Sequence, residues 1–194
     1  MQSSDTLAAV APVVDALERL GVAYYLGGSV VSSAYGLARS TLDVDLVADL
    51  AQAHVEPLTE SLASAYYVDA HMISDAIARK SCFNLIHLAT MFKVDVFAVK
   101  DRPYDHVALR RIRKDTLALE STAAQFFLAS PEDIVLNKLE WFRLGGEVSQ
   151  RQWADVIGVL KVQGHTLDKA YLTQWASDLA IADLLEKAWG ESET

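Results

Sequence analysis

The fold of this chain is decided by the stretch Thr41-Leu42-Asp43-Val44-Asp45-Leu46, in which acidic and apolar residues alternate. Successive side chains of a β-strand point to opposite faces, so a strand here would carry its apolar residues on one face and both carboxylates on the other. Two adjacent carboxylates repel each other, and a hard divalent cation such as Mg²⁺ relieves that repulsion. A half-buried strand without any site shows the same alternation, so this pair needs further support.

A second alternating run, Phe92-Lys93-Val94-Asp95-Val96, carries one more acid. If its strand lies beside the first, three carboxylates share a face and can hold two metal ions about 3.5–4 Å apart. Such a pair of ions activates an attacking oxygen and stabilises a leaving pyrophosphate. Asp43, Asp45 and Asp95 are therefore predicted metal ligands, and the predicted chemistry is nucleotidyl transfer.

A glycine-rich turn precedes the acids. The apolar run 22–26 reads as a short buried strand, and Gly27-Gly28-Ser29 then leads into a predicted helix that ends near residue 37. Backbone N–H groups at such a turn bind phosphate, and glycine permits the close approach of the ligand. Gly-Gly-Ser alone is more often an ordinary turn, so its weight comes from the acids that follow it.

The remaining pattern is mixed up to about residue 129 and helical beyond it. Hydrophobic periodicity and turn residues predict helical segments over 5–20 and 52–65 and strands over 42–47, 66–68, 81–88, 92–99, 107–116 and 125–128. Ser130 and Pro131 form a helix start, and helices are predicted over 130–144, 149–162, 167–179 and 181–189. This order predicts an α/β (α+β) fold, with a mixed sheet flanked by helices in residues 1–129 and a helical region in residues 130–194 packed on it.

Two charged residues in the helical region stand out. Lys138 falls within the apolar stripe of its helix, where an unpaired ammonium group is costly. We expect it to meet a carboxylate or a ligand phosphate, unless its charge reaches the surface. Asp155, in the next helix, is either a site residue or half of an exposed pair with Arg151 one turn earlier.

The motifs together resemble a known superfamily. Leu26-Gly27-Gly28-Ser29, the run Arg39-Ser40-Thr41-Leu42-Asp43-Val44-Asp45 and Phe92-Lys93-Val94-Asp95 are similar to the motifs of the DNA polymerase β-like nucleotidyltransferases. The Arg-x-Thr-x-Asp-x-Asp form and the spacing from Ser29 to Asp43 resemble the branch of the abortive-infection (AbiEii-like) toxins. The resemblance covers the chain up to about residue 99 and, less closely, the helices over 130–162.

The resemblance implies roles for individual residues. Gly28 and Ser29 would contact a nucleoside triphosphate such as ATP, Asp43 and Asp45 would bind metal, and Asp95 would activate the attacking hydroxyl. The resemblance extends to four further residues. Arg39 and Thr41 would flank the site and orient groups or contact phosphate, although a solvated arginine and a strand threonine are equally ordinary there. Lys138 and Asp155 are similar to a lysine and an acid on successive helices of the AbiEii-like proteins.

The predicted function is that of a magnesium-dependent nucleotidyltransferase, which uses two Mg²⁺ ions to move a nucleoside monophosphate to an acceptor hydroxyl with release of pyrophosphate. The resemblance favours RNA as acceptor, in particular the tRNA 3′ end, and a toxin role with a separate antitoxin protein. The alternatives are a small-molecule acceptor of the aminoglycoside type and a non-catalytic nucleotide-binding or interaction module.

Composition agrees with one globular chain. The 194 residues are 52% hydrophobic and 22% charged, with a single cysteine, Cys82. Neither a membrane-spanning segment nor a secretory signal is visible, so we expect a cytoplasmic protein. The net charge of −9 disfavours broad contact with nucleic acid, because phosphates would be repelled. A local basic cluster, the residues Arg110, Arg111, Arg113 and Lys114, is the exception and is either an acceptor contact or a solvated segment.

Overall fold

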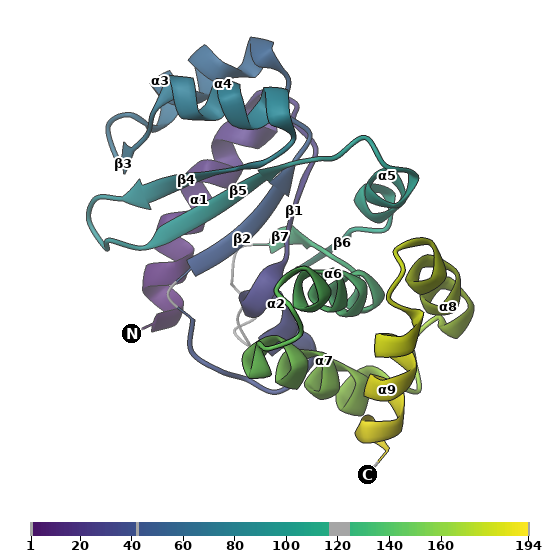
Figure 1. Ribbon diagram of the computed structural model, residues 1–194. Helices are drawn as coiled ribbons and strands as arrows, with labels where there is room; N and C mark the ends of the chain where they lie inside the picture. The colour runs from purple at the N-terminus through teal and green to yellow at the C-terminus, as the bar shows by residue number, and fades with distance from the viewer. Residues whose placement is uncertain (1, 42, 117–124, 194) are drawn as a thin grey trace.

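A mixed β-sheet with helices on both faces forms the body of the molecule (Figure 1). The computed structural model describes residues 2–41, 43–116 and 125–193. The strands are β1 (Tyr24–Leu26), β2 (Asp43–Ala48), β3 (Tyr66–Tyr67), β4 (Cys82–His87), β5 (Lys93–Ala98), β6 (Arg113–Thr116) and β7 (Gln125–Leu128). The helices are α1 (Gln2–Arg19), α2 (Gly28–Tyr35), the short 3₁₀ helix η1 (Gln52–His54), α3 (Val55–Leu62), α4 (Ala70–Arg79), α5 (Pro103–Arg110), α6 (Pro131–Leu144), α7 (Gln150–Gln163), α8 (Lys169–Asp178) and α9 (Ala182–Ser192). No helix within the described ranges is both long and apolar enough to cross a membrane.

The strands lie in the order β3-β4-β5-β2-β1-β7-β6. β2 pairs in parallel with β5 and antiparallel with β1, while β1 pairs in parallel with β7. The register joins Leu26 of β1 to Leu128 of β7, so segments far apart in the sequence lie side by side in the sheet. α6 begins directly after β7, and this connection brings the helical part of the chain to the same region.

The two faces of the sheet differ in the way the alternating stretch predicts. Val44 and Leu46 of β2 are fully buried, and α1 contacts both β2 and β5. Asp43 and Asp45 are half-buried, which gives β2 strictly alternating burial, while Leu42 lies outside the described residues. Because side chains of one strand alternate between faces, both acids point away from the core that α1 covers and toward the side of α2 and α6.

Two elements differ from the sequence predictions. The predicted strand over 107–116 begins as helix α5, in which Pro103 occupies the first turn, and only its end forms β6. α4 was not predicted at all, although Asp69 caps it by accepting hydrogen bonds from the backbone N–H groups of His71 and Met72. The predicted strands over 42–47, 81–88, 92–99 and 125–128 and the helices from residue 130 onward are present, with ends that differ by a few residues.

The start of α6 is held by a buried polar cluster. Ser130 caps the helix and donates a 2.6 Å hydrogen bond to Asp133, which also accepts one of 2.7 Å from Tyr171 of α8. Arg111 lies 3.3 Å from Glu132 and places its guanidinium 3.8 Å from the ring centroid of Tyr171. The predicted helix start is therefore confirmed. Arg111 is held by these contacts within the fold, so one of the four cations of the basic cluster is not free to contact an acceptor.

α7 lies against α2 with almost no space between the two backbones. A Cβ atom placed on Gly36, just after α2, would lie 2.7 Å from the carbonyl carbon of Gly158 in α7. A Cβ atom on Gly158 would in turn lie 3.1 Å from the backbone nitrogen of Leu37. This close approach packs α7 of the helical region directly on α2. The division into domains at residue 129 stays a prediction.

We expect Gly36→Ala to lower the free energy of unfolding by about 1–3 kcal/mol, because the added methyl group meets backbone atoms that cannot rotate away. Urea unfolding of the purified variant measures this loss. Gly190→Ala is the matched control, since a Cβ atom on Gly190 in α9 meets nothing within 4 Å and alanine favours the helix. Equal stability of Gly36→Ala and the wild type would contradict the close packing.

Candidate active site

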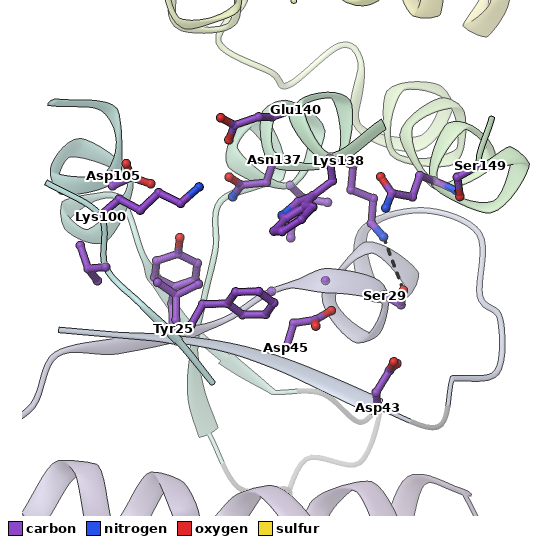
Figure 2. A pocket seen from close by; sticks show the side chains of 18 of the residues that line it. Tyr25, Ser29, Asp43, Asp45, Lys100, Asp105, Asn137, Lys138, Glu140 and Ser149 are labelled. Atoms are coloured by element: carbon purple, nitrogen blue, oxygen red, sulfur yellow. Dashed lines mark hydrogen bonds between the residues drawn. The ribbon is translucent and has the colours of Figure 1, made fainter. Parts of the chain in front are cut away.

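Asp43 and Asp45 line a cavity of about 420 Å³ between the sheet and helices α6 and α7. Figure 2 shows Asp45 pointing into this space below Lys138, with Asp43 at its edge. The register places Asp45 directly beside Asp95 of the parallel strand β5. The two acidic strands therefore lie side by side, as a site built from three carboxylates needs.

The turn before α2 is built around Asp45. The backbone N–H of Gly27 donates a 2.9 Å hydrogen bond to the carbonyl oxygen of Asp45. Gly28 has a positive φ of 58°, and a Cβ atom there would lie 1.6 Å from Asp45 Oδ2. Only glycine satisfies both demands, so the N-terminus of α2 can lie against the carboxylate. Ser29 follows in the first turn of the helix.

The charge of Asp45 is poorly compensated. Burial, followed by the negative charges of Asp43 and Asp95, raises the pKa of its carboxyl to about 6. The cations Lys138 and Lys93 oppose this shift without cancelling it. The site thus has an excess of negative charge that a bound cation would relieve.

The other two acids have polar partners of their own. Thr41 Oγ1 donates a 2.5 Å hydrogen bond to Asp43 Oδ1, which orients this carboxylate. Asp95 is buried, forms an ion pair of 2.8 Å with Lys93, and accepts a hydrogen bond from Asn84 of β4. Within the described ranges no group of three or more His, Cys, Asp or Glu side chains is arranged to hold a metal ion. The metal-binding role of the three aspartates stays a prediction.

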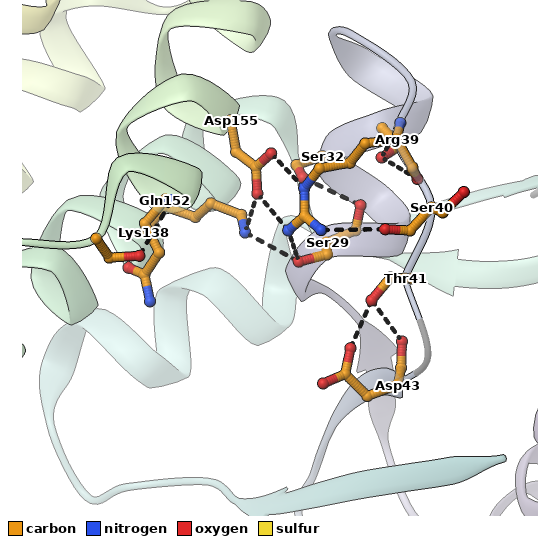
Figure 3. A network of polar contacts seen from close by, with 11 residues as sticks. Ser29, Ser32, Arg39, Ser40, Thr41, Asp43, Lys138, Gln152 and Asp155 are labelled. Carbon is orange, nitrogen blue, oxygen red and sulfur yellow. Dashed lines mark hydrogen bonds and ion pairs between the residues drawn. The ribbon is translucent and has the colours of Figure 1, made fainter.

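A second charged group lies above the N-terminus of α2 (Figure 3). Asp155 of α7 accepts a 2.7 Å hydrogen bond from Lys138 Nζ and two from Arg39, of 2.8 and 2.9 Å. Both cations also reach Ser29 Oγ, with Lys138 Nζ at 3.4 Å. Lys138 is thus buried against a carboxylate and does not extend to the surface, and Asp155 pairs with these two cations and not with Arg151.

The electrostatics of this group favour an anion beside Ser29. Burial alone would raise the pKa of Asp155, but the hydrogen bonds and charges of Arg39 and Lys138 outweigh it and hold the pKa below its ordinary value. Asp155 is therefore ionised at neutral pH and neutralises one of the two cations. One positive charge remains at a helix N-terminus, a place where phosphate oxygens are stabilised.

Several residues in or beside the site were not found from the sequence. Lys93 carried a usable signal, since it lies two residues before Asp95 and so shares its face of the strand. Asn84 did not, because its position beside Asp95 depends on the pairing of β4 with β5. The aromatic residues Phe97 and Trp141 line the cavity from two different elements and likewise required the fold.

Comparison with solved structures identifies the architecture. The structure is similar to an antigenic nucleotidyltransferase-like protein from Paracoccidioides brasiliensis, with 18% identity and a TM-score of 0.58 over 94% of this chain and 93% of that one. The chain has a nucleotidyltransferase fold. No protein-family model matches the sequence, and no curated protein matches it.

Two further nucleotidyltransferase structures cover most of the chain. The antibiotic-resistance factor ANT(2'')-Ia is 11% identical, with a TM-score of 0.54 over 100% of this chain and 97% of that one. The lincosamide antibiotic adenylyltransferase LnuA, determined with lincomycin bound, is 14% identical, with a TM-score of 0.51 over 82% of this chain and 96% of that one. At these identities the likeness concerns the nucleotidyltransferase fold, and the fold class predicted from the sequence is confirmed.

The raised pKa of Asp45 has a consequence for stability in metal-free buffer. Between the ordinary carboxyl value of 3.8 and about 6, the folded protein holds a proton that the unfolded chain has lost, so stability falls as pH rises through this window. Asp45→Asn removes the effect. We expect its free energy of unfolding to exceed that of the wild type increasingly over this window, by on the order of 2–3 kcal/mol above pH 6.

Urea unfolding in EDTA at several pH values between 4 and 7.5 measures this difference. Asp49→Asn, which removes an exposed carboxylate just beyond the same strand, controls for the loss of one negative charge. A difference between Asp45→Asn and the wild type that stays constant with pH would show that Asp45 is not destabilised by its surroundings.

Proposed function

We propose that this protein is a magnesium-dependent nucleotidyltransferase that moves a nucleoside monophosphate from a nucleoside triphosphate to an acceptor hydroxyl. One observation carries the proposal. Inside a nucleotidyltransferase fold, Asp43 and Asp45 line one cavity, and the Asp45 carboxylate lies directly against a helix N-terminus. Lys138 and Arg39 leave positive charge beside Ser29 there. Acids for a metal and donors for a triphosphate thus meet in one cavity.

The residues fit Mg²⁺. Asp43 and Asp45 supply carboxylate oxygens, the donors that this hard cation prefers. Burial, followed by the negative charges of Asp43 and Asp95, raises the pKa of Asp45, and a bound cation would offset both effects. Asp95 completes the set when its carboxylate leaves Lys93. Bound Mg²⁺ would supply neutralisation of phosphate charge and polarisation of the reacting oxygens.

The protein groups then have separate tasks. Ser29, Lys138 and Arg39 hold the β- and γ-phosphates, so that the α-phosphorus lies over the acidic strands. The acceptor oxygen attacks the α-phosphorus, the bond from this atom to the bridging oxygen of the β-phosphate breaks, and pyrophosphate leaves. Asp95 takes the proton of the attacking hydroxyl. Thr41 keeps the Asp43 carboxylate oriented throughout.

RNA is the first candidate acceptor. The Arg39-x-Thr41-x-Asp43-x-Asp45 motif supports it through its resemblance to the AbiEii-like toxins, and with it a toxin role, a tRNA 3′ end as target and an antitoxin partner. The exposed basic residues Arg113 and Lys114 of the edge strand β6 are available to phosphates.

Two alternatives each rest on one observation. The similarity in fold to the lincosamide antibiotic adenylyltransferase LnuA, which spans 96% of that chain, favours a small-molecule acceptor. The contacts of Asp95 with Lys93 and Asn84 favour a non-catalytic module, because they occupy the carboxylate that would act as base. Such a module would bind a nucleotide without releasing pyrophosphate.

Incubation of the pure protein with Mg²⁺, total RNA and each α-labelled nucleoside triphosphate in turn tests the proposal. We expect one triphosphate to label RNA and EDTA to abolish the reaction. Asp43→Ala should lower the rate by at least about a hundredfold, since a metal ligand is lost. Asp49→Ala, which removes an exposed acid beyond the same strand, is the matched control and should retain activity.

The other results separate the alternatives. Pyrophosphate release without labelled RNA, in the presence of an aminoglycoside or a lincosamide, supports the small-molecule acceptor. Nucleotide binding with no pyrophosphate release under any condition supports the non-catalytic module. Full activity of Asp43→Ala would refute the assigned metal site.

A further inference from the structure

We propose that the end of the cavity farther along the strands from Asp43, formed by Tyr25, Val47, Phe97, Asn137 and Trp141 and here termed the aromatic end, binds the nucleoside part of the triphosphate. The inference rests on the proposed function and adds to it the position at which the nucleobase binds. Residues from three strands, β1, β2 and β5, and from helix α6 meet at this end, and none of them is among the acids or cations discussed above.

The floor of the aromatic end is one row of the sheet. Tyr25 pairs with Val47 and Val47 with Phe97, so the three side chains lie side by side on the face that carries Asp45. Val47 follows Asp45 by two residues, a separation of about 6.6 Å along the strand. A nucleoside attached to an α-phosphate over Asp45 would therefore lie above this apolar row.

The roof comes from α6. Trp141 packs edge-to-face against Phe97, with ring centroids 6.0 Å apart, and remains 47% exposed at the mouth of the cavity. Asn137, one turn earlier, places its amide beside the Tyr25 hydroxyl (Figure 2). Lys138 lies on the same helix, so α6 carries contacts for both the phosphates and the aromatic end. A flat ring laid against the Trp141–Phe97 pair, over the row of floor residues, gains aromatic contacts. Asn137 offers a donor and an acceptor to the edge of such a ring.

The charges around the aromatic end cancel. Arg102 forms an ion pair of 2.6 Å with Asp105 and a bidentate contact with Glu140, one arm of which measures 3.2 Å. Lys100 adds a second positive charge, so that two cations match the two acids. All four residues line the cavity. Both carboxylates are already engaged by Arg102, so a polycation finds no free partner here. An uncharged, hydrogen-bonding aromatic group such as a nucleobase suits this environment.

Titration calorimetry in Mg²⁺ with inorganic tripolyphosphate and each of the four nucleoside triphosphates tests the assignment. We expect at least one nucleotide to bind the wild type about tenfold more tightly than tripolyphosphate, because base stacking on aromatic side chains contributes on this scale. Trp141→Ala and Asn137→Ala should remove most of this preference and leave the affinity for tripolyphosphate unchanged. Leu144→Ala, an exposed change on the same helix, should alter neither affinity.

Three results would overturn the assignment. Equal binding of nucleotides and tripolyphosphate by the wild type would mean that the nucleoside makes no contact. If both variants still bind the nucleotide more tightly than tripolyphosphate but show a raised KM for the acceptor, the aromatic end binds the acceptor and not the nucleoside. Binding of neither ligand by the folded wild type would refute the proposed function itself and this assignment with it.

Discussion

The carboxylate of Asp155 is the group on which the rest of the site depends. It lies on α7, yet it holds Lys138 of α6 and Arg39 of the segment between α2 and β2. Without it, two cations would face each other across Ser29 in a partly buried place, and their repulsion would separate the elements that carry them. With it, one net positive charge is fixed beside the first turn of α2. Three separate parts of the chain thus meet at one positively charged place, where we propose that phosphate binds.

Steric constraint makes this electrostatic arrangement possible. Asp155 reaches the N-terminus of α2 because Gly36 and Gly158 let the two helix backbones come into contact. Gly28, at the start of the same helix, leaves the space that the carboxylate of Asp45 occupies. α2 is therefore held between an acid that would bind metal and an acid that positions cations. Each of the three glycines removes a side chain that would force one of these charges away.

Much of the site followed from local sequence patterns, because strand alternation and helix periodicity are local properties. Alternation placed Asp43 and Asp45 on one face, and the apolar stripe of α6 showed that Lys138 needed a partner. These local patterns do not predict which distant segments pair in the sheet. The contacts of Asp95 depend on β4, and the aromatic floor depends on three strands that only the sheet brings together. Helix α4, by contrast, carries its buried residues Ile73, Ala76 and Ile77 at helical spacing, so local patterns are sufficient to predict it.

The sheet order also has a consequence for synthesis on the ribosome. All three aspartates belong to strands made early, but β1 completes its pairing only when β7 emerges, and Asp155 follows later still. A growing chain that ends before β7 leaves β1 unpaired on one side, and one that ends before α7 has the acids of β2 without Asp155. Domains acquire function as their last contacts form during translation. The complete charged site should therefore assemble in one late step, after α7 has left the exit tunnel.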